Sequence, residues 1–328
     1  MKKFKYYIMT GLLFCVSFAE AQIDPHFTQY YAGPMWLNPA MTGVMDGNYR
    51  TTANIRNQWA SVATPLLTKG ISLDAALPNN FGIGLMVLNQ SAGDGGYNYT
   101  NSYLSLSYQV HLSAYKRLSG GFQLGFIYRG VDPSKLKFGN QFNPLVGYDP
   151  TLPSNEIFSK TSAYTLDGSV GVMYYDGDPN KKINPFAGVS LYHPTQPTDK
   201  FLQASNSFIP VRYSIHAGTR IAVSDLVHLT PHVIYERQGA ASEIAGGLYM
   251  NYTLDYSKDL IAGVMYRNND AIAPNIGINL NGFIVGLSYD INISTLNSAS
   301  QYRGGYEISI SYVHRKKIPA TRFICPRL

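Results

Sequence analysis

The sequence has few charged residues, almost no cysteine and no apolar run long enough for a transmembrane helix after its first residues. Charged residues make up 14% of its 328 residues, against about 25% in ordinary soluble domains. The two cysteines are Cys15 and Cys325, and Cys15 lies in a segment that we expect to be removed, which excludes an internal disulfide framework. No run of Lys and Arg is long enough to predict a nucleic-acid surface.

The first 21 residues are typical of a secretory signal peptide. A basic start at 2–5 precedes an apolar stretch at 8–18, and the small-x-small sequence at 19–21 suits signal peptidase. We therefore expect a mature chain that begins at Gln22, outside the cytoplasm. Removing three lysines and one glutamate changes the formal charge from +6 by −3 and +1, which leaves +4.

Glycine and tyrosine are abundant, with 30 and 26 residues. In the segments that contain them, apolar and polar residues alternate. In GFQLGFIYR, Phe122, Leu124 and Phe126 face one way while Gln123 and Arg129 face the other. The segments 103–111 and 306–314 alternate in the same manner. A period of two predicts strands, and one apolar and one polar face is what lipid and lumen require of a transmembrane β-barrel.

About fourteen segments of this kind follow one another, which predicts a single antiparallel all-β transmembrane barrel. The predicted strands are 47–58, 68–78, 80–89, 99–111, 119–130, 162–175, 183–192, 210–222, 226–237, 241–252, 258–267, 272–280, 282–291 and 304–314. The predicted domain limits are signal peptide 1–21, periplasmic N-terminal segment 22–46, barrel 47–314 and periplasmic C-terminal tail 315–328.

The lengths of the connections support this order of strands. The three longest connections are 131–161, 193–209 and 292–303, and all lie at the same predicted end, while those at the opposite end are short turns. Bacterial barrels have short periplasmic turns and longer outer loops. We therefore expect both termini at the periplasmic end and the long loops outside.

A soluble β-sandwich also alternates apolar and polar residues, so the position of tyrosines matters. Many lie near the ends of predicted strands, as expected of aromatic girdles at the two bilayer interfaces. These tyrosines are Tyr49, Tyr99, Tyr108, Tyr128, Tyr174, Tyr192, Tyr235, Tyr249, Tyr266, Tyr289 and Tyr312. The pattern favours a membrane barrel over a sandwich.

Several charged residues and histidines are predicted to form a polar lumen network: Arg50, Arg56, Arg129, Arg212, His216, Arg220, His228, His232 and Glu236. His228 and His232 share a strand face, but residues four apart on a strand lie about 13 Å apart, which disfavours a shared zinc ion. We predict no metal, no cofactor and no catalytic site, because no spacing brings a nucleophile, a base and an orienting group together. The sequence leaves open whether the lumen is a pore or is plugged.

The two ends of the mature chain are unusual. The opening segment QIDPHFTQYYAGPMWLNPAMTG, residues 22–43, has many aromatic residues, and its prolines prevent simple strand pairing. It either packs into the periplasmic mouth of the barrel or binds a partner there. The predicted periplasmic partner-binding residues are Phe27, Tyr30, Tyr31, Trp36, Asn38, Pro39, Arg315, Phe323, Cys325 and Arg327.

These ends resemble the PorP/SprF membrane proteins of the type IX secretion system of Bacteroidota. The resemblance lies in DPHFTQYY and WLNPAMTG, in GVMYRNNDAI at 263–272, in SYDINISTLNSASQYRGGYEISISY at 288–312 and in the terminal CPR at 325–327. The motifs span the mature chain, and the closing Leu328 departs from the aromatic residue expected there.

The resemblance implies a non-enzymatic outer-membrane barrel that assists export and holds a sorted surface protein, such as a gliding adhesin. It implies as partners a secreted substrate with a C-terminal sorting domain, other secretion subunits and peptidoglycan-linked periplasmic lipoproteins, besides outer-membrane lipid. The alternative function is a passive porin or solute transporter.

Overall fold

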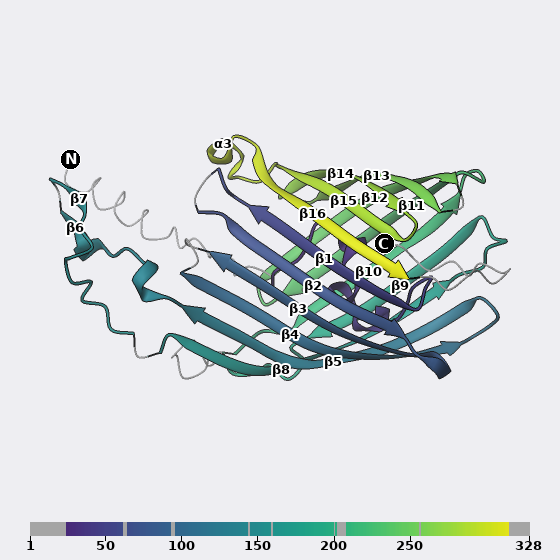
Figure 1. The fold of residues 1–328 in the computed structure, drawn as a ribbon, viewed down its shortest axis with the longest axis horizontal. Helices are drawn as coiled ribbons and strands as arrows, with labels where there is room; N and C mark the ends of the chain where they lie inside the picture. The colour runs from purple at the N-terminus through teal and green to yellow at the C-terminus, as the bar shows by residue number, and fades with distance from the viewer. Residues whose placement is uncertain are drawn as a thin grey trace, which may run out of the picture.

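The computed structural model describes residues 24–61, 64–92, 96–143, 145–158, 160–199, 201, 208–255 and 257–314. Fourteen strands close into one barrel (Figure 1). They are β1 (Tyr49–Gln58), β2 (Leu66–Ala76), β3 (Phe81–Ala92), β4 (Tyr97–His111), β5 (Lys116–Val131), β8 (Ser162–Asp176), β9 (Ile183–Tyr192), β10 (Arg212–Ala222), β11 (Val227–Gln238), β12 (Ala241–Asp255), β13 (Lys258–Arg267), β14 (Ala271–Leu280), β15 (Phe283–Asn292) and β16 (Arg303–His314).

Each strand pairs antiparallel with its neighbours, and β1 pairs with β16 to close the barrel. The closing register sets Tyr49 opposite His314 and Gln58 opposite Gly305. The predicted fold class and the order of all fourteen strands are confirmed. The bounds differ by a few residues at most, as at β5, which begins at Lys116.

Exposure along the strands is the reverse of that in a soluble protein. On β2, Ser72 faces the lumen and is 4% exposed, whereas Leu73 points outward and is 50% exposed. The same inversion holds on β5, where Gln123 is buried between exposed Phe122 and Leu124. An apolar exterior around a polar interior requires lipid outside, so the sandwich alternative is excluded. Among the described helices, none has both the length and the apolarity to cross a bilayer.

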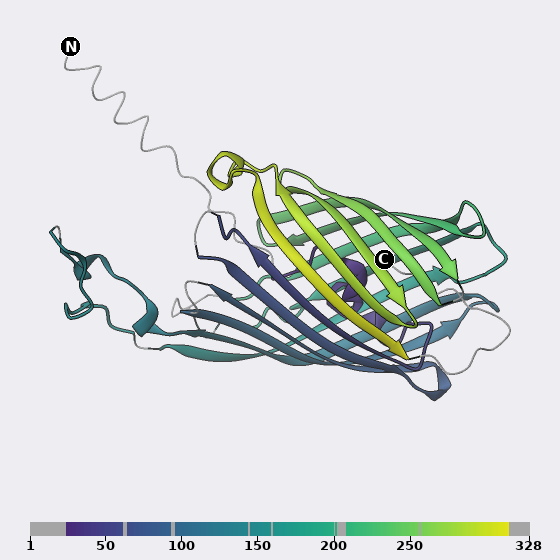
Figure 2. The same cartoon turned by 45° about the horizontal axis from the view of Figure 1, so that its top comes forward.

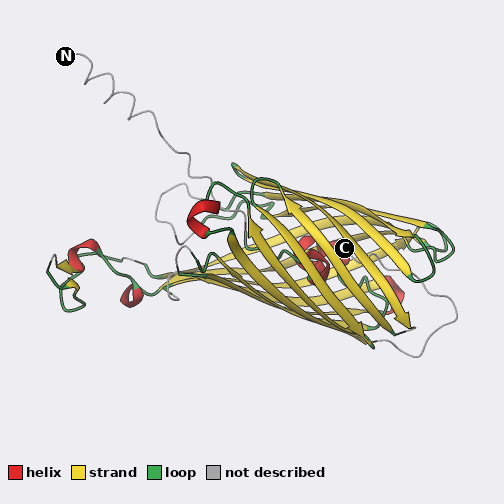
Figure 3. Cartoon of the chain, turned by 90° about the horizontal axis from the view of Figure 1, so that it is seen from above, coloured by secondary structure: helices red, strands yellow, loops and turns green. Residues whose placement is uncertain are grey.

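The long connections gather at one end of the barrel (Figures 1 and 2). We call this the long-loop end and the other the short-turn end. The longest connection, between β5 and β8, is an arm that projects away from the barrel and ends in the two-stranded sheet of β6 (Phe142–Asn143) and β7 (Gly147–Tyr148) (Figure 3). The arm also has the helical turns η4 (Pro133–Lys135) and η5 (Gly139–Gln141), and α3 (Asn297–Ser300) lies in the loop before β16.

The segment before β1 does not lie beneath the barrel but runs through its interior. Asp24 contacts His193 and Gln238 at the long-loop end, and the chain then descends through the lumen to β1 at the short-turn end. It contains η1 (Tyr30–Ala32), α2 (Pro34–Leu37), η2 (Pro39–Met41), all within the barrel. The described residues 24–44 therefore lie inside the barrel and not outside its periplasmic mouth, where the segment 22–46 is predicted from the sequence. A further turn, η3 (Pro78–Asn80), joins β2 and β3.

The physical reason is the composition of that segment. Its aromatic and apolar side chains must be buried, its prolines prevent strand pairing, and a fourteen-stranded barrel has an interior wide enough to hold a polypeptide. The predicted signal peptide 1–21 and tail 315–328 lie outside the described residues, so their domain assignments stay predictions.

Candidate functional site

The lumen is filled by residues 24–44, which we call the plug. Its short helical turns follow from local sequence: Pro34 and Pro39 each open a turn, where a proline's missing N–H costs nothing. Asn38 caps the second turn, because its Oδ1 accepts from the Ala40 N–H at 2.9 Å. Nearly every residue of the plug is buried. The turns are too short to satisfy their own last carbonyls, so the wall has to satisfy these backbone groups.

Side chains of the wall donate hydrogen bonds to backbone carbonyls of the plug. The donors are Ser107 to Thr42 (2.6 Å), Ser119 to Ala40 (2.6 Å), Gln123 to Met35 (3.1 Å), Ser190 to Leu37 (2.8 Å) and Tyr192 to Trp36 (2.7 Å). They come from β4, β5 and β9. The wall also accepts, since Glu307 receives the N–H groups of Thr28 and Gln29 at 2.6 and 3.2 Å. In these hydrogen bonds the wall contacts main-chain groups of the plug and not its side chains.

Inward-facing glycines give the plug its room. A Cβ built on Gly171 would lie 2.1 Å from Asn38 Oδ1, and one on Gly121 would lie 2.4 Å from the Pro39 carbonyl oxygen. Gly82 and Gly286 are blocked in the same way by Thr42 and Gln29. Glycine is common where another backbone approaches a strand closely. These glycines on the strands therefore lie where the plug approaches the wall most closely.

Two apolar clusters join the plug to the wall. In the first, Tyr30, Leu37 and Met41 pack with wall residues that include Met173 and Phe186. In the second, Phe27, Met35 and Trp36 pack with Met86, Leu88, Tyr99, Tyr103, Ile127 and Ile209. Phe27 and Trp36 meet edge to face at 5.3 Å. Each fully buried large apolar side chain stabilises by about 1.5–3 kcal/mol, so the plug is a packed interior.

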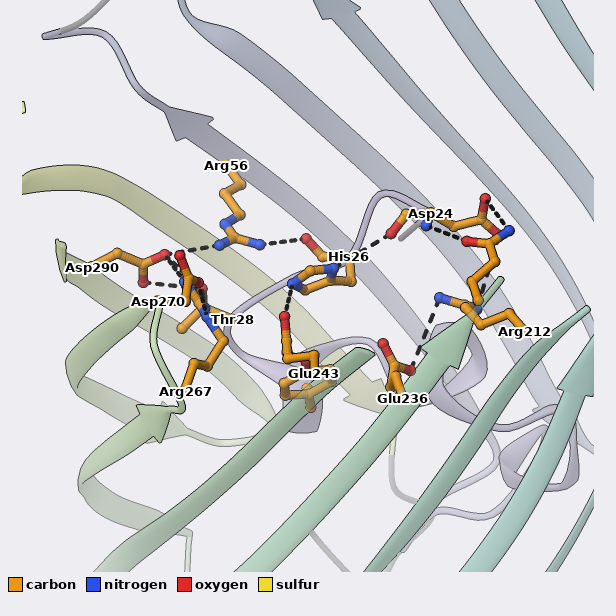
Figure 4. Close-up of polar contacts among 12 residues, drawn as sticks. Asp24, His26, Thr28, Arg56, Arg212, Glu236, Glu243, Arg267, Asp270 and Asp290 are labelled. Carbon is orange, nitrogen blue, oxygen red and sulfur yellow. Dashed lines mark hydrogen bonds and ion pairs between the residues drawn. The ribbon is translucent and has the colours of Figure 1, made fainter. Parts of the chain in front are cut away.

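A carboxylate latch holds the plug at the long-loop end. Asp24 Oδ2 lies 2.5 Å from His193 Nε2, and His193 Nδ1 lies 2.8 Å from Asp167. Tyr103 donates to Asp167, and Arg212 Nε lies 3.9 Å from Asp24. The Gln238 side-chain amide accepts from the Asp24 N–H at 2.8 Å and donates to Asp24 Oδ1 at 3.2 Å. Asp24 and Arg212 are shown in Figure 4.

Charge fixes the protonation of this latch. Burial alone would lower the pKa of His193, in the loop beyond β9, but the carboxylates of Asp24 and Asp167 raise it to about 9. Burial alone would raise the pKa of Asp24, but His193 and Arg212 hold it well below its usual range. The pair is therefore ionised at neutral pH, with opposite charges in contact.

A second anchor surrounds Asp290 (Figure 4). Its Oδ2 lies 2.8 Å from Arg56 Nη2 and 2.6 Å from Arg267 Nη2. Both guanidinium groups also bond the plug: Arg56 donates to the His26 carbonyl at 2.7 Å and Arg267 to the Thr28 hydroxyl at 2.7 Å. Burying these charges is costly unless each is paired, so this arrangement depends on the plug as well as on the wall.

Two further carboxylates of the wall, Glu243 and Asp74, complete the plug's attachment. His26 Nε2 lies 3.3 Å from Glu243 Oε2, and the Tyr30 hydroxyl donates to Glu243 at 2.8 Å. At the short-turn end Asp74 accepts from the Gly43 N–H at 2.8 Å and pairs with Arg50 at 2.7 Å. The plug is therefore held by charge at both ends of the lumen and along its length.

Most residues of the predicted lumen network do line the lumen. Arg50, Arg56 and Arg212 bind as described, and Arg129 pairs with Asp199 at 2.5 Å. Arg212 also lies 4.0 Å from Glu236, and Arg220 lies 3.5 Å from Asn184.

The predicted histidines face the lumen too. His232 stacks on Tyr249 at 4.6 Å, His216 is buried against Gly188 and Asn38, and His228 is half-buried on the same face of β11 as His232. Within the described ranges, no group of three or more His, Cys, Asp and Glu side chains is suited to hold a metal ion.

The predicted partner-binding residues fall into two sets. Phe27, Tyr30, Trp36, Asn38 and Pro39 are buried in the lumen, and Tyr31 packs edge to face on Tyr249 at 4.8 Å. In this arrangement they contact the chain's own wall, the packing alternative. Arg315, Phe323, Cys325 and Arg327 lie outside the described residues, and their binding of partners stays a prediction.

Three of the tyrosines assigned to the girdles face inward instead. Tyr99, Tyr192 and Tyr249 are buried against the plug, because the plug offers aromatic and carbonyl partners inside the barrel. Sequence reasoning also missed Asp24, His193, Arg267, Glu243 and Glu307. The only signal that points to these residues is the need of each buried charge for a partner, and the partners can be identified only in the folded structure.

The arm, residues 131–161, has a small structure of its own. Asp149 N–H donates to the Gln141 carbonyl at 2.8 Å, and Phe142 packs on Tyr148 at 5.6 Å. Its surface includes exposed aliphatic side chains: Leu145 and Ile157 are each 94% exposed. An ordered tip with bare aliphatic side chains is typical of a surface that binds another macromolecule.

Comparisons with known proteins agree with the fold. A family model described as "Type IX secretion system membrane protein PorP/SprF" matches residues 19–312. No curated protein matches the chain. Among solved structures, the toluene transporter TbuX of Ralstonia pickettii is similar with a TM-score of 0.52 and 10% identity, over 87% of this chain and 94% of that chain. The toluene transporter TodX of Pseudomonas putida has a TM-score of 0.52 and 9% identity, over 89% of this chain and 98% of that chain.

Proposed function

This chain belongs to the PorP/SprF family of type IX secretion system membrane proteins, and on that premise we propose that it holds an exported protein at the cell surface without being an enzyme. The fold is that of an outer-membrane barrel. The proposed client carries a C-terminal sorting domain, as a gliding adhesin would. The proposed periplasmic partners are other secretion subunits and peptidoglycan-linked lipoproteins, bound through the tail 315–328.

The observation that carries the proposal is that the described lumen is occupied by the plug. A filled lumen gives a dissolved solute no straight path, which opposes the rival function of a passive porin. The transporters that share the fold are under 25% identical, so their substrates carry no weight for this chain. A client on the cell surface would instead bind the surface of the long-loop end.

The arm is the surface that we assign to the client. It stands away from the barrel (Figure 3), which leaves both sides of its tip accessible. Internal bonds fix the tip, since Gln141 donates to the Leu152 carbonyl at 3.1 Å and Asn140 to the Ser154 carbonyl at 2.9 Å. A pre-ordered apolar surface binds at lower entropic cost than a flexible one.

Shortening the arm tests the proposal. Deletion of residues 139–152 should leave the barrel in the outer membrane while at least one large surface protein is released to the medium. Quantitative comparison of surface and medium proteins with those of a gene deletion identifies the client. The matched control shortens 294–301, the loop of α3, and should retain the client. If the complete gene deletion releases no surface protein, the proposed function is wrong.

A further inference from the structure

The lumen wall is built to recognise a polypeptide by its main chain. Five wall side chains donate to carbonyls between Met35 and Thr42, and Glu307 accepts two plug N–H groups. Main-chain groups are common to all polypeptides. A segment that forms short turns like Pro34–Leu37 and Pro39–Met41 therefore offers the wall the same carbonyl and N–H partners that the plug offers.

The side-chain requirements of this site are few and well defined. The latch takes one carboxylate at the long-loop end, where His193, Arg212 and Gln238 converge on Asp24. The cluster around Met86 and Tyr103 takes apolar or aromatic groups, now Phe27 and Trp36. The glycine-lined stretch takes the side chain of Asn38 beside Gly171 and the backbone of Pro39 beside Gly121.

The plug is also placed so that it can be replaced. It continues into β1 only through residues 45–48, and Asp24, the first described residue, lies at the long-loop end, the side on which an exported protein is expected. Replacing the plug by a segment of similar conformation exchanges similar contacts, so the net free energy of replacement is a small difference between two large and similar terms. A large number of contacts between plug and wall therefore does not by itself prevent another segment from replacing the plug.

We infer that the lumen is a polypeptide-binding site that the plug occupies in the resting protein and that a terminal, unfolded segment of the exported client occupies in its place. This inference rests on the proposed function and names the chemistry of its ligand. The ligand is a segment with a carboxylate at the long-loop end, aromatic side chains in the Met86–Tyr103 cluster and an Asn-Pro-like turn beside Gly121 and Gly171.

A reversible lock on the plug tests the inference in the full chain. Thr42 Oγ1 of the plug lies 2.6 Å from Ser105 Oγ of the wall, which is close enough for Thr42→Cys and Ser105→Cys to form a disulfide. The matched control is Thr52→Cys with Ser311→Cys, a buried pair 2.9 Å apart that joins two wall strands. All variants carry Cys325→Ser, so that only the designed thiols pair.

The first probe is a fluorescent synthetic peptide of residues 24–44, added to purified protein. We expect binding to the reduced lock variant and to the control, and a loss of about tenfold or more when the lock is oxidised. An Asp24→Asn peptide should bind about tenfold more weakly, since it loses a charge-assisted contact. Equal binding to locked and unlocked protein, or no binding to either, overturns the inference.

The second measurement follows, in cells, the surface proteins that the gene deletion releases. The oxidised lock should release them and added reductant should restore retention, whereas the control pair should retain them throughout. Retention by the locked protein overturns the lumen site but leaves the proposed function standing. The proposed function itself fails only if the complete gene deletion releases no surface protein, so the two failures are distinguishable.

Discussion

The carboxylate of Asp24 lies 2.5 Å from Nε2 of His193, although the two residues are 169 positions apart in the chain. The contact lies at the long-loop end, opposite the end at which β1 begins. It shows that the described chain begins at the long-loop end and reaches its first strand by passing through the barrel. The function of the lumen therefore depends on what keeps this segment inside.

The latch predicts a loss of stability in alkali. The pKa of His193 is raised from 6.5 to about 9, so its contribution is complete below 6.5 and is lost as the pH rises through 9. The pKa of Asp24 is lowered from 3.8, so its contribution is lost only as the pH falls below that value. The thermal midpoint in detergent should fall from pH 6.5 to 9.5, and the fall should be smaller in His193→Gln. Parallel curves for the two proteins would refute the latch.

Adjacent glycines on β5 give a matched pair of substitutions. Gly121→Ala places a Cβ 2.4 Å from the Pro39 carbonyl oxygen, while a Cβ on Gly120 meets nothing within 4 Å. Overpacking a filled interior costs about 1–3 kcal/mol. Gly121→Ala should therefore lower the free energy of unfolding by about that amount, and Gly120→Ala should not. Urea titration in lipid vesicles measures both, and equal effects would show that the plug does not press on this strand.

The buried anchor predicts a large effect at Asp290. Asp290→Ala leaves the guanidinium groups of Arg56 and Arg267 without their shared carboxylate. Removing one partner of a buried ion pair costs about 3–5 kcal/mol, and we expect a loss of that order in vesicle unfolding. The control is Asp255→Ala, whose pair with Lys258 is exposed and should matter little. A small effect at Asp290 would mean that the anchor is hydrated.

The path of the plug predicts which side of the membrane its tip faces. An epitope inserted directly before Asp24 should be reached by antibody on intact cells, because Asp24 lies at the long-loop end. An epitope in the turn Asn281-Gly282, between β14 and β15, should be reached only after lysis. The opposite labelling pattern would place the opening segment on the periplasmic side after all.

The barrel could be predicted from the sequence because each strand carries its own signal. Alternation such as Phe122-Gln123-Leu124 is local, and it follows from a wall with lipid on one side and a filled lumen on the other. The short connections at one predicted end and the long ones at the other then supported the order of the strands. Neither inference needs a contact between distant residues.

The plug could not be located in this way, because its partners are distributed along the whole chain. Nothing in the spacing of Asp24 and His193, or of Thr28 and Arg267, reveals that they meet. Glycines such as Gly121 look the same whether they ease strand tilt or admit a second backbone. The aromatic segment raised the right question, namely where its rings are buried, and only the closed barrel answers it.

The central claim is that the chain's own opening segment closes the lumen, and electrical conductance tests it most directly. Purified full-length protein in a planar bilayer should carry no steady current. The same protein with a protease site placed at Asp46, an exposed residue between the plug and β1, should show stable open channels after cleavage and washing out of the freed plug. Steady ion flow through the uncleaved protein would contradict the account.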